Sequence, residues 1–462
     1  MAEKDKKFDP VRAAVIEIIG HVEKEKLSTD EAIYRTIKGR LFSQLDLRFI
    51  RQLVNGTIKM KRRLDHDIKF FLNKPSEKMS GRLQNILRLG FFQLFFTDRI
   101  PDAAAVSESV NLAHFFCDNS RARLVNAVLR SALRHPERVV FRDRNEDPAG
   151  YLADYYSYPD WFVTYCLSEF KYGQVEEMLK NMNLPPKMSI RVNSFKSNIN
   201  EITNELNERQ IKFSRAKHLP EFIYLEEGGI SPGDELLSLG KLYIQDESAG
   251  LAVRLLNPKQ NQSVLDMAAA PGGKATYAAA RMRNKGMITA VDKSRPRLEL
   301  MIENSQRLGV TIMNPVLADN KEFKGGPFDR VLLDTPCSGW GNAGKHSDLR
   351  WIKTVEDVQK LAKLQANMLD KAARLVKPGG VLVYSTCTII RKENDDIVEE
   401  FLVRHPDYIL ESAANYFGPE IVTERGFIKT YPNKPNLSGA FAARLKKKPI
   451  LKKNGDSGSS KL

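Results

Sequence analysis

Two cysteines in the C-terminal half of the chain lie in loops that could form one reactive site. Cys337 lies in the segment 334–341 (DTPCSGWG), and Cys387 lies in the segment 384–388 (YSTCT). Two neighbouring thiols can bind a metal ion, form a disulfide, or act as a nucleophile and its helper. No histidine or cysteine follows at a metal-ligand spacing, so we expect no metal site. A structural disulfide is disfavoured in a reducing compartment, which leaves the nucleophile and its helper as the favoured interpretation.

A second stretch that could do chemistry is the segment 263–276 (SVLDMAAAPGGKAT). Its apolar run, Pro-Gly-Gly turn and Ala-rich continuation predict a buried strand, a tight turn and a helix N-terminus, which together form a cradle for a nucleotide. Gly272 and Gly273 allow a positive φ and a close approach of a ligand. A phosphate-binding P-loop is the rival interpretation, but it needs glycine at Ala268 and serine or threonine at Ala275. The cradle therefore suits a nucleoside without a triphosphate.

Acidic residues end the strands that would carry these loops. Asp266 ends the strand before the cradle, and Asp292, Asp319 and Asp334 end three later apolar runs. An acid about 26 residues after Asp266 is placed to accept hydrogen bonds from ribose hydroxyls, which assigns that role to Asp292. Asp319 can accept from an adenine amino group in the same cleft. For each acid alone, a strand-end cap or a helix N-cap is the alternative.

These loops must be positioned by a sheet whose strands alternate with helices. From residue 245 onward, short β-branched runs alternate with helical segments, a pattern that predicts an α/β, doubly wound, Rossmann-like sheet. Ligands bind beyond the carboxyl ends of the strands in this architecture, where the acids and both cysteines fall. The predicted elements are strands at 263–265, 287–291, 316–318, 328–333 and 381–384, and an amphipathic helix at 355–376.

These motifs resemble those of a known enzyme family. The segment 266–274 reads DMAAAPGGK and the cysteine loops read DTPCSG and TC, which is similar to the RNA cytosine-C5 methyltransferases of the Sun/Fmu type. The resemblance spans residues 8–445 and, with the N-terminal helices, points to the bacterial members that act on 16S ribosomal RNA. It implies a class I methyltransferase sheet, S-adenosylmethionine as cofactor, Cys387 as nucleophile and Cys337 as the residue that assists product release. The residue types alone do not decide which cysteine has which role.

The implied reaction explains why two thiols would be needed. Carbon 5 of a pyrimidine is too weak a nucleophile to attack a sulfonium methyl group unaided. A thiolate that adds to carbon 6 makes carbon 5 nucleophilic, and elimination later restores the aromatic ring. We expect Asp334 to contact the base at N3 or N4 and Lys274 to be a cation that lowers the pKa of the thiol. The candidate cofactor-binding residues are Ala269, Ala270, Pro271, Gly272, Gly273, Lys274, Asp292, Arg297, Asp319 and Asp334.

Residues 1–140 show apolar spacing typical of helices throughout. The segment 86–96 is apolar nearly all round, so we expect a buried central helix there, and Asp46 is expected to cap a helix that starts at Leu47. The motifs RQLVNGT and VNAVLR make this part resemble the all-helical, RNA-binding NusB-type domain. Its basic cluster is the candidate phosphate contact, with a solvated helix face as the alternative. The cluster comprises Arg48, Arg51, Lys59, Lys61, Arg62 and Arg63.

The remaining segments complete a predicted division into domains. Residues 150–239 mix helix and strand, and the segment 185–193 (PPKMSIRVN) resembles the small α+β domain that lies between the helical and catalytic domains of the same enzymes. Residues 240–446 are the expected methyltransferase domain. Residues 447–462 are rich in Lys, Gly and Ser, and we expect a disordered basic tail there.

The charge balance favours a polyanionic partner. The chain has 72 Lys and Arg residues against 57 Asp and Glu residues, a net charge of +15 that favours nucleic acid. No signal peptide and no apolar run of membrane length is evident, so we expect a cytoplasmic protein that does not contact a membrane. We expect a monomer that acts on 16S ribosomal RNA, naked or early in assembly. The alternatives are the same reaction on transfer RNA, and a non-catalytic RNA-binding or antitermination factor.

Overall fold

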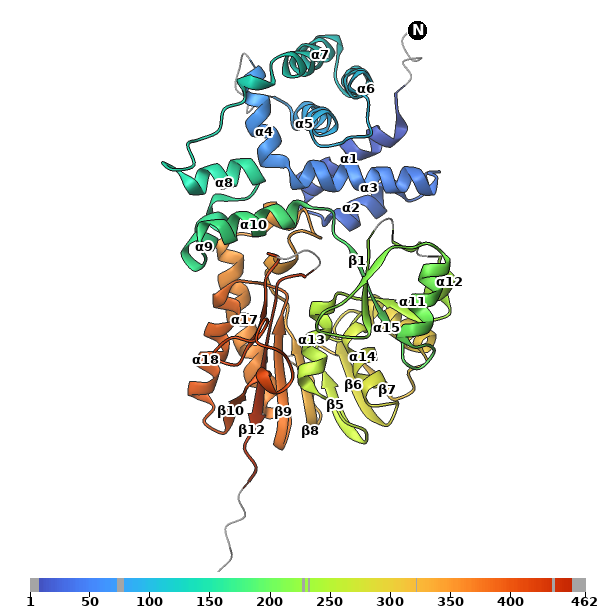
Figure 1. Ribbon diagram of the computed structural model, residues 1–462, viewed down its shortest axis with the longest axis vertical. Helices are drawn as coiled ribbons and strands as arrows, with labels where there is room; N and C mark the ends of the chain where they lie inside the picture. Colours follow the sequence, from blue (N-terminus) through green and yellow to red (C-terminus); the bar gives the residue numbers. More distant parts are fainter. Residues whose placement is uncertain are drawn as a thin grey trace, which may run out of the picture. The chain divides into compact units, whose positions relative to one another are not determined.

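The structure, a computed structural model, describes residues 8–72, 79–226, 229–231, 233–320, 322–433 and 437–450. Its contacts divide the chain into two compact units (Figure 1). We call the first the helical unit, which comprises Met1–Leu184 and Ala343–Thr354. We call the second the sheet unit, which comprises Pro185–Asn342 and Val355–Leu462. Among the described residues, no helix combines the length and the apolar character that crossing a membrane requires.

The helical unit contains helices and no strand among its described residues, which confirms the all-α class of the N-terminal part. Most residues of α5 between Leu83 and Gln93 are buried, as expected for the central helix. The helices are α1 (Pro10–Glu25), α2 (Thr29–Ile37), α3 (Gln44–Lys59), α4 (Lys61–Ile68), α5 (Gly81–Phe95), α6 (Asp102–Phe116), α7 (Asn119–Arg134), α8 (Pro148–Tyr156), α9 (Asp160–Glu169), α10 (Tyr172–Asn183) and α16 (Leu349–Ile352).

The start of α3 corrects one expectation. Ser43 is the N-cap, and its side chain accepts a hydrogen bond from the N–H of Asp46. The carboxylate of Asp46 accepts in return from the N–H of Ser43 at 2.9 Å, which completes a capping box. Asp46 is therefore the third residue of the helix rather than its cap. The expectation was wrong because it ignored the serine three residues earlier.

The helical unit also includes α8 to α10, which the division drawn from the sequence placed with the strands that follow. It further includes the segment 343–354, which is far from the other helices in sequence. Arg350 of this segment is buried, stacks 3.8 Å from the ring centroid of Tyr158 and donates to Asn183 at 2.8 Å. The indole nitrogen of Trp351 donates to a main-chain carbonyl of α3 at 2.6 Å. Aromatic and charged contacts therefore hold this segment among the N-terminal helices.

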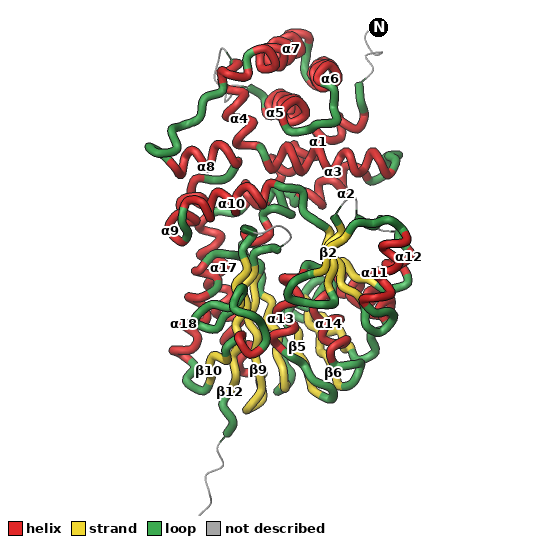
Figure 2. The backbone as a smooth tube through the Cα atoms, in the orientation of Figure 1, coloured by secondary structure: helices red, strands yellow, loops and turns green. Residues whose placement is uncertain are grey.

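The sheet unit begins with a small antiparallel sheet that has the strand order β2-β3-β1-β4 (Figure 2). Its apolar core combines the inner face of the sheet with the helix α11. This mixed α and β content agrees with the sequence-based expectation for the middle of the chain. The elements are β1 (Met188–Val192), β2 (Phe213–Arg215), β3 (Phe222–Leu225), β4 (Leu242–Ile244), α11 (Ile199–Glu208) and α12 (Glu235–Ser238).

The larger sheet has eight strands in the order β10-β12-β9-β8-β5-β6-β7, with β11 paired to β12. The five strands from β9 to β7 are parallel, and β12 joins them antiparallel to β9. The strands are β5 (Gln262–Asp266), β6 (Gly286–Asp292), β7 (Met313–Leu317), β8 (Phe328–Asp334), β9 (Val376–Thr386), β10 (Tyr408–Glu411), β11 (Ile428–Thr430) and β12 (Ala440–Lys447). The helices are α13 (Glu247–Leu256), α14 (Gly273–Arg281), α15 (Arg295–Leu308), α17 (Val355–Arg374) and α18 (Asp395–Arg404).

This order confirms the Rossmann-like, doubly wound sheet. The chain runs outward from β5 through β6 to β7 and then returns to β8 on the other side, so the order reverses next to β5. Ligands of such sheets bind at the carboxyl edge near that reversal. Two details differ from the expectation: β7 ends two residues before Asp319, and Lys447 belongs to β12 rather than to a tail. The rest of the predicted disordered tail, from residue 451, lies outside the described residues.

Candidate active site

The predicted cradle forms where β5 leads into α14. Gly272 has a φ of +100°, and its N–H donates to the carbonyl of Ala269 at 2.7 Å. A Cβ added to Gly272 would lie 2.8 Å from the side chain of Met301, so both the conformation and the space require glycine. Ala269 and Ala270 are buried under the turn, whereas Pro271 is exposed. The turn thus brings main chain and a helix N-terminus together, as a nucleoside site requires.

Arg191 of β1 fixes the cradle from the small sheet. Its guanidinium donates to the carbonyl of Gly273 at 2.7 Å, to the side chain of Gln245 at 2.5 Å and to the hydroxyl of Thr276 at 3.0 Å. Arg191 is buried, and burial lowers the pKa of this guanidinium to about 10. The sequence interpretation missed its role, although the RVN motif that resembles the family contains it.

Asp292 lies on the floor of the cradle at the end of β6. It is buried and accepts from the N–H of Ala270 at 3.3 Å and from that of Ser294 at 2.9 Å. Arg297 of α15 lies 3.6 Å from the same carboxylate and also donates to the carbonyl of Ala270. Asp319 follows the next strand and is half-buried. Because β5, β6 and β7 are parallel neighbours, both acids and the cradle share one edge of the sheet.

Asp266, at the end of β5, is a buried acid that was left out of the candidate cofactor-binding residues. One carboxylate oxygen accepts from the N–H of Ala268 at 3.3 Å, and the other has no partner among the described residues. Burial raises the pKa of Asp266 to about 7, and the positive charge of Lys274 opposes this shift. Its position as the first residue of the DMAAAPGGK motif was the feature of the sequence that could have placed Asp266 among the cofactor-binding candidates.

The two predicted thiols are in contact. The Sγ atoms of Cys337 and Cys387 lie 3.2 Å apart, at the ends of the neighbouring parallel strands β8 and β9. The hydrogen bond that Cys337 donates to the sulfur of Cys387 lowers the pKa of Cys387 below its ordinary value. Burial and the negative charge of Asp334 oppose this lowering of the Cys387 pKa, and the positive charge of Lys274 adds to it. Holding that hydrogen raises the pKa of Cys337 well above its ordinary value, so Cys387 ionises first.

Lys274 joins the cradle to the thiol loops. Its ammonium lies 2.7 Å from the carboxylate of Asp334 at the end of β8. The hydroxyl of Ser385, on β9, donates to the other oxygen of Asp334 at 2.9 Å. Burial disfavours the Lys274 ammonium, but the charges of Asp334 and Asp266 outweigh it and raise the pKa of Lys274. The lysine therefore stays charged between the cofactor cradle and the Cys387 thiol.

Glu393 fixes the loop that carries Cys337 and was missed from the sequence. It is completely buried, and it accepts from the N–H of Ser338 at 2.8 Å and from the amide of Gln365 at 3.0 Å. Burial raises the pKa of Glu393, and the hydrogen bonds from Ser338 oppose that shift. Its segment 391–396 (RKENDD) has the composition of a solvated surface. The available signal was an acid only six residues after the second cysteine.

Two residues of the basic cluster predicted to contact RNA are used inside the helical unit. Lys59 is buried, and its ammonium donates to the carbonyl of Gly344 at 2.9 Å. Burial, with a contribution from Arg350, lowers the pKa of Lys59 to about 7. Arg62 is held by carboxylates of α8 and α9 at 2.7 and 2.8 Å. These two side chains are therefore not available to phosphates, because packing and ion pairs already occupy them.

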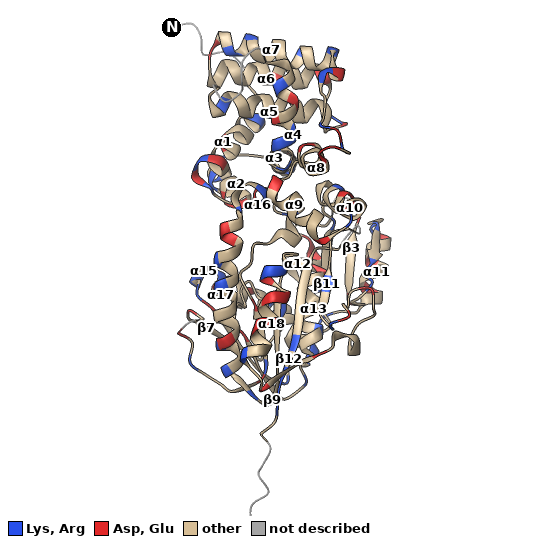
Figure 3. Ribbon diagram, turned by 90° about the vertical axis from the view of Figure 1, so that its left-hand side faces the viewer, with Lys and Arg blue, Asp and Glu red and all other residues tan. Residues whose placement is uncertain are grey.

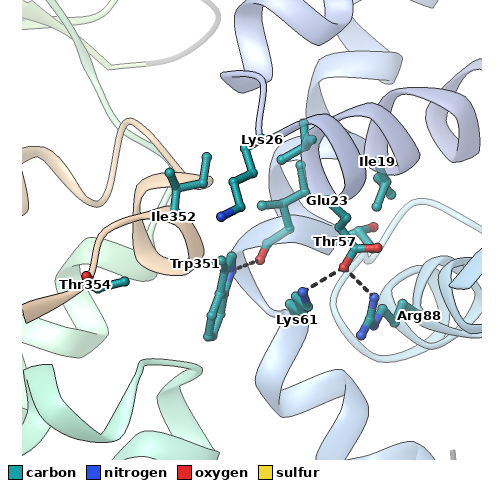
Figure 4. Close-up of a pocket in the computed structure, with 11 residues that line it drawn as sticks. Ile19, Glu23, Lys26, Thr57, Lys61, Arg88, Trp351, Ile352 and Thr354 are labelled. Carbon is teal, nitrogen blue, oxygen red and sulfur yellow. Dashed lines mark hydrogen bonds and ion pairs between the residues drawn. The ribbon is translucent and has the colours of Figure 1, made fainter. Parts of the chain in front are cut away.

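Two more cations of the cluster are paired as well. Arg63 donates to Asp67 at 2.8 Å and stacks 4.3 Å from the ring centroid of Phe141. Lys61 lies 2.7 Å from Glu23, whose carboxylate Arg88 also contacts (Figure 4). Figure 4 shows Glu23, Lys61 and Arg88 beside a small cavity of the helical unit.

The last two members of the cluster lie on the surface of α3. Arg51 is exposed and forms an ion pair with Asp30 at 3.0 Å, and Arg48 is exposed. An exposed ion pair of this kind exchanges readily with solvent or another anion. Only these two residues of the predicted cluster are therefore free to meet a phosphate at little cost.

Family models of known proteins match all three parts of the chain. The family model described as 16S rRNA methyltransferase RsmB/F matches residues 253–446. The NusB family model matches residues 9–134, and a model described as a ferredoxin-like domain of RsmF/B-like methyltransferases matches residues 158–230. These three matches follow the helical, mixed and Rossmann-like parts of the chain in order.

Individual relatives cover nearly all of the chain. A probable ribosomal RNA small subunit methyltransferase B of Bacillus subtilis is 34% identical over 445 residues, which is 95% of this chain and 99% of the relative. The crystal structure of PH0851 covers 96% of this chain and 100% of its own, with a TM-score of 0.76 and 26% identity. NSun6 of Pyrococcus horikoshii, solved with SFG, covers 62% of this chain and 96% of its own, with a TM-score of 0.55 and 25% identity. The chain therefore belongs to the family of 16S rRNA methyltransferases RsmB/F.

Proposed function

We propose that this protein methylates carbon 5 of a cytosine in 16S ribosomal RNA, with S-adenosylmethionine as donor and a covalent cysteine adduct as intermediate. The observation that carries the proposal is the contact of two thiols at 3.2 Å, joined to the cofactor cradle by the ion pair of Lys274 and Asp334 at 2.7 Å. A methyltransferase of a more nucleophilic atom would need neither thiol. Membership of a 16S rRNA methyltransferase family supports the substrate.

The residues at the cradle fit S-adenosylmethionine. Gly272 and Gly273 allow main-chain contact, and Asp292 presents a buried carboxylate where a ribose would lie. The unpartnered oxygen of Asp266 is an acceptor that the cationic methionyl part of the donor would satisfy. When bound, S-adenosylmethionine supplies an electrophilic methyl group. The relative solved with SFG supports a cofactor site in this part of the fold.

Cys387 is the nucleophile in this proposal. The hydrogen bond from Cys337 and the charge of Lys274 both favour its thiolate, which adds to carbon 6 of the cytosine. The new S–C6 bond would place electron density on carbon 5, which would take the methyl group as the bond from that group to the sulfonium sulfur breaks and a neutral thioether remains. A water molecule would then accept the proton from carbon 5, and cleavage of the S–C6 bond would restore the aromatic ring and return the thiolate to Cys387. Because the lower pKa falls on Cys387, the order of the two thiols agrees with the family pattern.

Asp334 recognises the base. Its carboxylate is held by Lys274 on one oxygen and by Ser385 on the other, so it is positioned as a hydrogen-bond acceptor. An acceptor suits the exocyclic amino group of cytosine and opposes uracil, which presents a carbonyl at that position. Contact at N4 is therefore favoured over donation to N3.

Cys337 assists the release of the product. Its sulfur lies 3.2 Å from that of Cys387, so its S–H can donate to the Cys387 sulfur, which becomes the leaving group in the adduct. A donor at 3.2 Å stabilises the charge that returns to the sulfur as the S–C6 bond breaks. Without that donor, the addition and the methyl transfer can still occur, but elimination slows.

The test is a trapping experiment with cysteine variants and a 16S ribosomal RNA transcript. Cys337→Ala should transfer the methyl group and accumulate protein covalently attached to RNA, which migrates slowly on a denaturing gel. Cys387→Ala and the double variant should form no adduct, and Cys117→Ala, which removes a thiol of the helical unit, should behave like the unmodified protein. Bisulfite sequencing of the RNA should show a protected cytosine only where activity remains. An adduct in Cys387→Ala that disappears in the double variant would reverse the two roles.

A further inference from the structure

A groove lies between α6 and α7 of the helical unit, and its lining residues come from these two helices rather than from α3 and α4. Its volume is about 550 Å³, and the two helices that form it lie side by side (Figure 1). Polar side chains from both helices line it, including Ser107, Asn111 and His114 from α6 and Arg123 and Asn126 from α7. Apolar side chains such as Val106, Val110 and Leu133 line it as well, so the groove offers a ligand both polar groups and apolar surface.

The charge of this groove comes from α7. The helix contains four arginines and no Asp or Glu, and Lys and Arg positions stand out along it in Figure 3. Arg121 forms an ion pair with Asp118, whereas Arg123, Arg130 and Arg134 are exposed and have no carboxylate partner among the described residues. This is the opposite of α3 and α4, where carboxylates or packing occupy most of the cations.

One carboxylate, that of Asp102, lines the groove together with the guanidinium groups of Arg123 and Arg130. A hydrogen bond orients the guanidinium of Arg130, since its Nε donates to the side-chain oxygen of Asn126 at 2.8 Å. His114 also lines the groove, and its buried Nδ1 atom has no partner within the described part of the chain. A buried polar atom that lacks a partner costs free energy, so it favours a ligand that can supply one.

The spacing of the arginines fits a nucleic-acid backbone. Residues 123, 130 and 134 lie on one side of α7, and a rise of about 1.5 Å per residue places the outer two roughly 16 Å apart. A strand with stacked bases carries one phosphate per roughly 3.4 Å, so this length covers about five nucleotides. The amide and hydroxyl groups of the groove can then meet sugars or base edges.

We infer that the groove between α6 and α7 binds a single-stranded segment of the RNA substrate, with its phosphates on Arg123 and Arg130 of the groove lining and on Arg134, one turn further along α7. The inference rests on the RNA methylation proposed above and adds the surface that holds the RNA. It replaces α3 and α4 as the main site of phosphate contact in the helical unit. The favoured ligand is RNA rather than an acidic protein, because the arginines are spaced along one helix at intervals that match successive phosphates of a nucleic-acid strand.

The experiment measures how RNA affinity depends on salt. The full-length protein and the variant Arg123→Gln/Arg130→Gln/Arg134→Gln are titrated with an unstructured 12-nucleotide RNA at several KCl concentrations. Three lost phosphate contacts on single-stranded RNA should reduce the slope of log K against log salt by about 2. From about 50 to 200 mM salt, the unmodified protein should then lose roughly twentyfold more affinity than the variant.

The matched control removes the same charge elsewhere. Arg35→Gln/Arg40→Gln/Arg121→Gln alters three arginines that are exposed and paired with carboxylates, and it should leave the slope nearly unchanged. Equal losses of slope in both triple variants would mean that net charge acts without a groove, and the inference would fail. An unchanged slope in the groove variant would also overturn it and would leave an acidic protein as the ligand to test. S-adenosylmethionine binding should be equal in all three proteins, and a wild-type protein that binds no RNA at all would instead refute the proposed function.

Discussion

Replacing Arg191 with methionine should show how strongly the small sheet supports the cofactor cradle. The change keeps an unbranched side chain of similar length but removes a buried guanidinium that bridges β1 to the first turn of α14. Three hydrogen bonds are lost, to Gly273 at 2.7 Å, to Gln245 at 2.5 Å and to Thr276 at 3.0 Å. The stacking of the guanidinium 5.0 Å from the ring centroid of Tyr277 is lost as well.

Two opposing contributions set how far Arg191→Met lowers the free energy of unfolding. Hydrogen bonds from a charged donor contribute about 1.5–3 kcal/mol each, and the variant leaves the Gly273 carbonyl and the Gln245 side chain buried without this donor. Against this, methionine does not have to be desolvated as a cation, a cost that is visible in the lowered pKa of Arg191. We expect the free energy of unfolding of the sheet unit to fall by about 2–4 kcal/mol. For a unit of this size the melting temperature should fall by roughly 4–16 °C.

Thermal unfolding with and without S-adenosylmethionine provides the assay. The transition that rises on adding the cofactor reports on the unit that binds it. In Arg191→Met this transition should occur at a lower temperature than in the unmodified protein. Titration calorimetry should also find weaker cofactor binding, because the hydrogen bond that holds the Gly273 carbonyl is lost. Arg283→Met, which changes an exposed arginine just after α14, should match the unmodified protein in both measurements. If Arg191→Met keeps the same transition temperature and the same affinity, the small sheet does not support the cradle.

The other two predictions concern the thiol loops and the cofactor site. A Cβ on Gly341 would lie 2.0 Å from the carbonyl oxygen of Gly439 and 2.8 Å from that of Cys387, so Gly341→Ala should displace the loop and lower the methylation rate about 100-fold. The control Gly233→Ala changes a glycine with open space around it and should leave the rate unchanged. Full activity in Gly341→Ala would contradict the packing argument. Because burial raises the pKa of Asp266 to about 7, its carboxylate is charged only above that pH, and affinity for the cationic cofactor measured by calorimetry should rise with pH through about 7. Asp266→Asn should abolish this rise, and a variant that keeps it would move the titrating group elsewhere.

Much of the candidate site could be predicted from the sequence because its residues lie at strand ends. Alternating strands and helices put Asp292 and the two cysteines at one edge of a parallel sheet, and the structure has β8 and β9 as neighbours. The double glycine predicted a turn with positive φ, which Gly272 adopts. These features depend on local pattern and on the general geometry of doubly wound sheets, both of which a sequence carries.

Residues whose role depends on distant partners could not be predicted in this way. Glu393 looks like part of a charged surface until Ser338 and Gln365, which are 55 and 28 residues away, close around it. Lys59 looks like an RNA contact until the carbonyl of Gly344 and the helices of its unit bury it. A sequence shows where charges are, but burial and ion pairing are set by the tertiary contacts that neutralise them.

The path of the chain has a consequence for how such a protein can evolve. The chain crosses between the two units three times, after residues 184, 342 and 354, so the helical unit is encoded in two separate stretches of the gene. An exchange of the N-terminal stretch alone would leave Arg350 and Trp351 without the helices that bury and hydrogen-bond them. The RNA-binding and catalytic parts therefore cannot be shuffled as independent cassettes. A recombinant protein would fold only if its new N-terminal helices could pack against the twelve residues of the segment Ala343–Thr354.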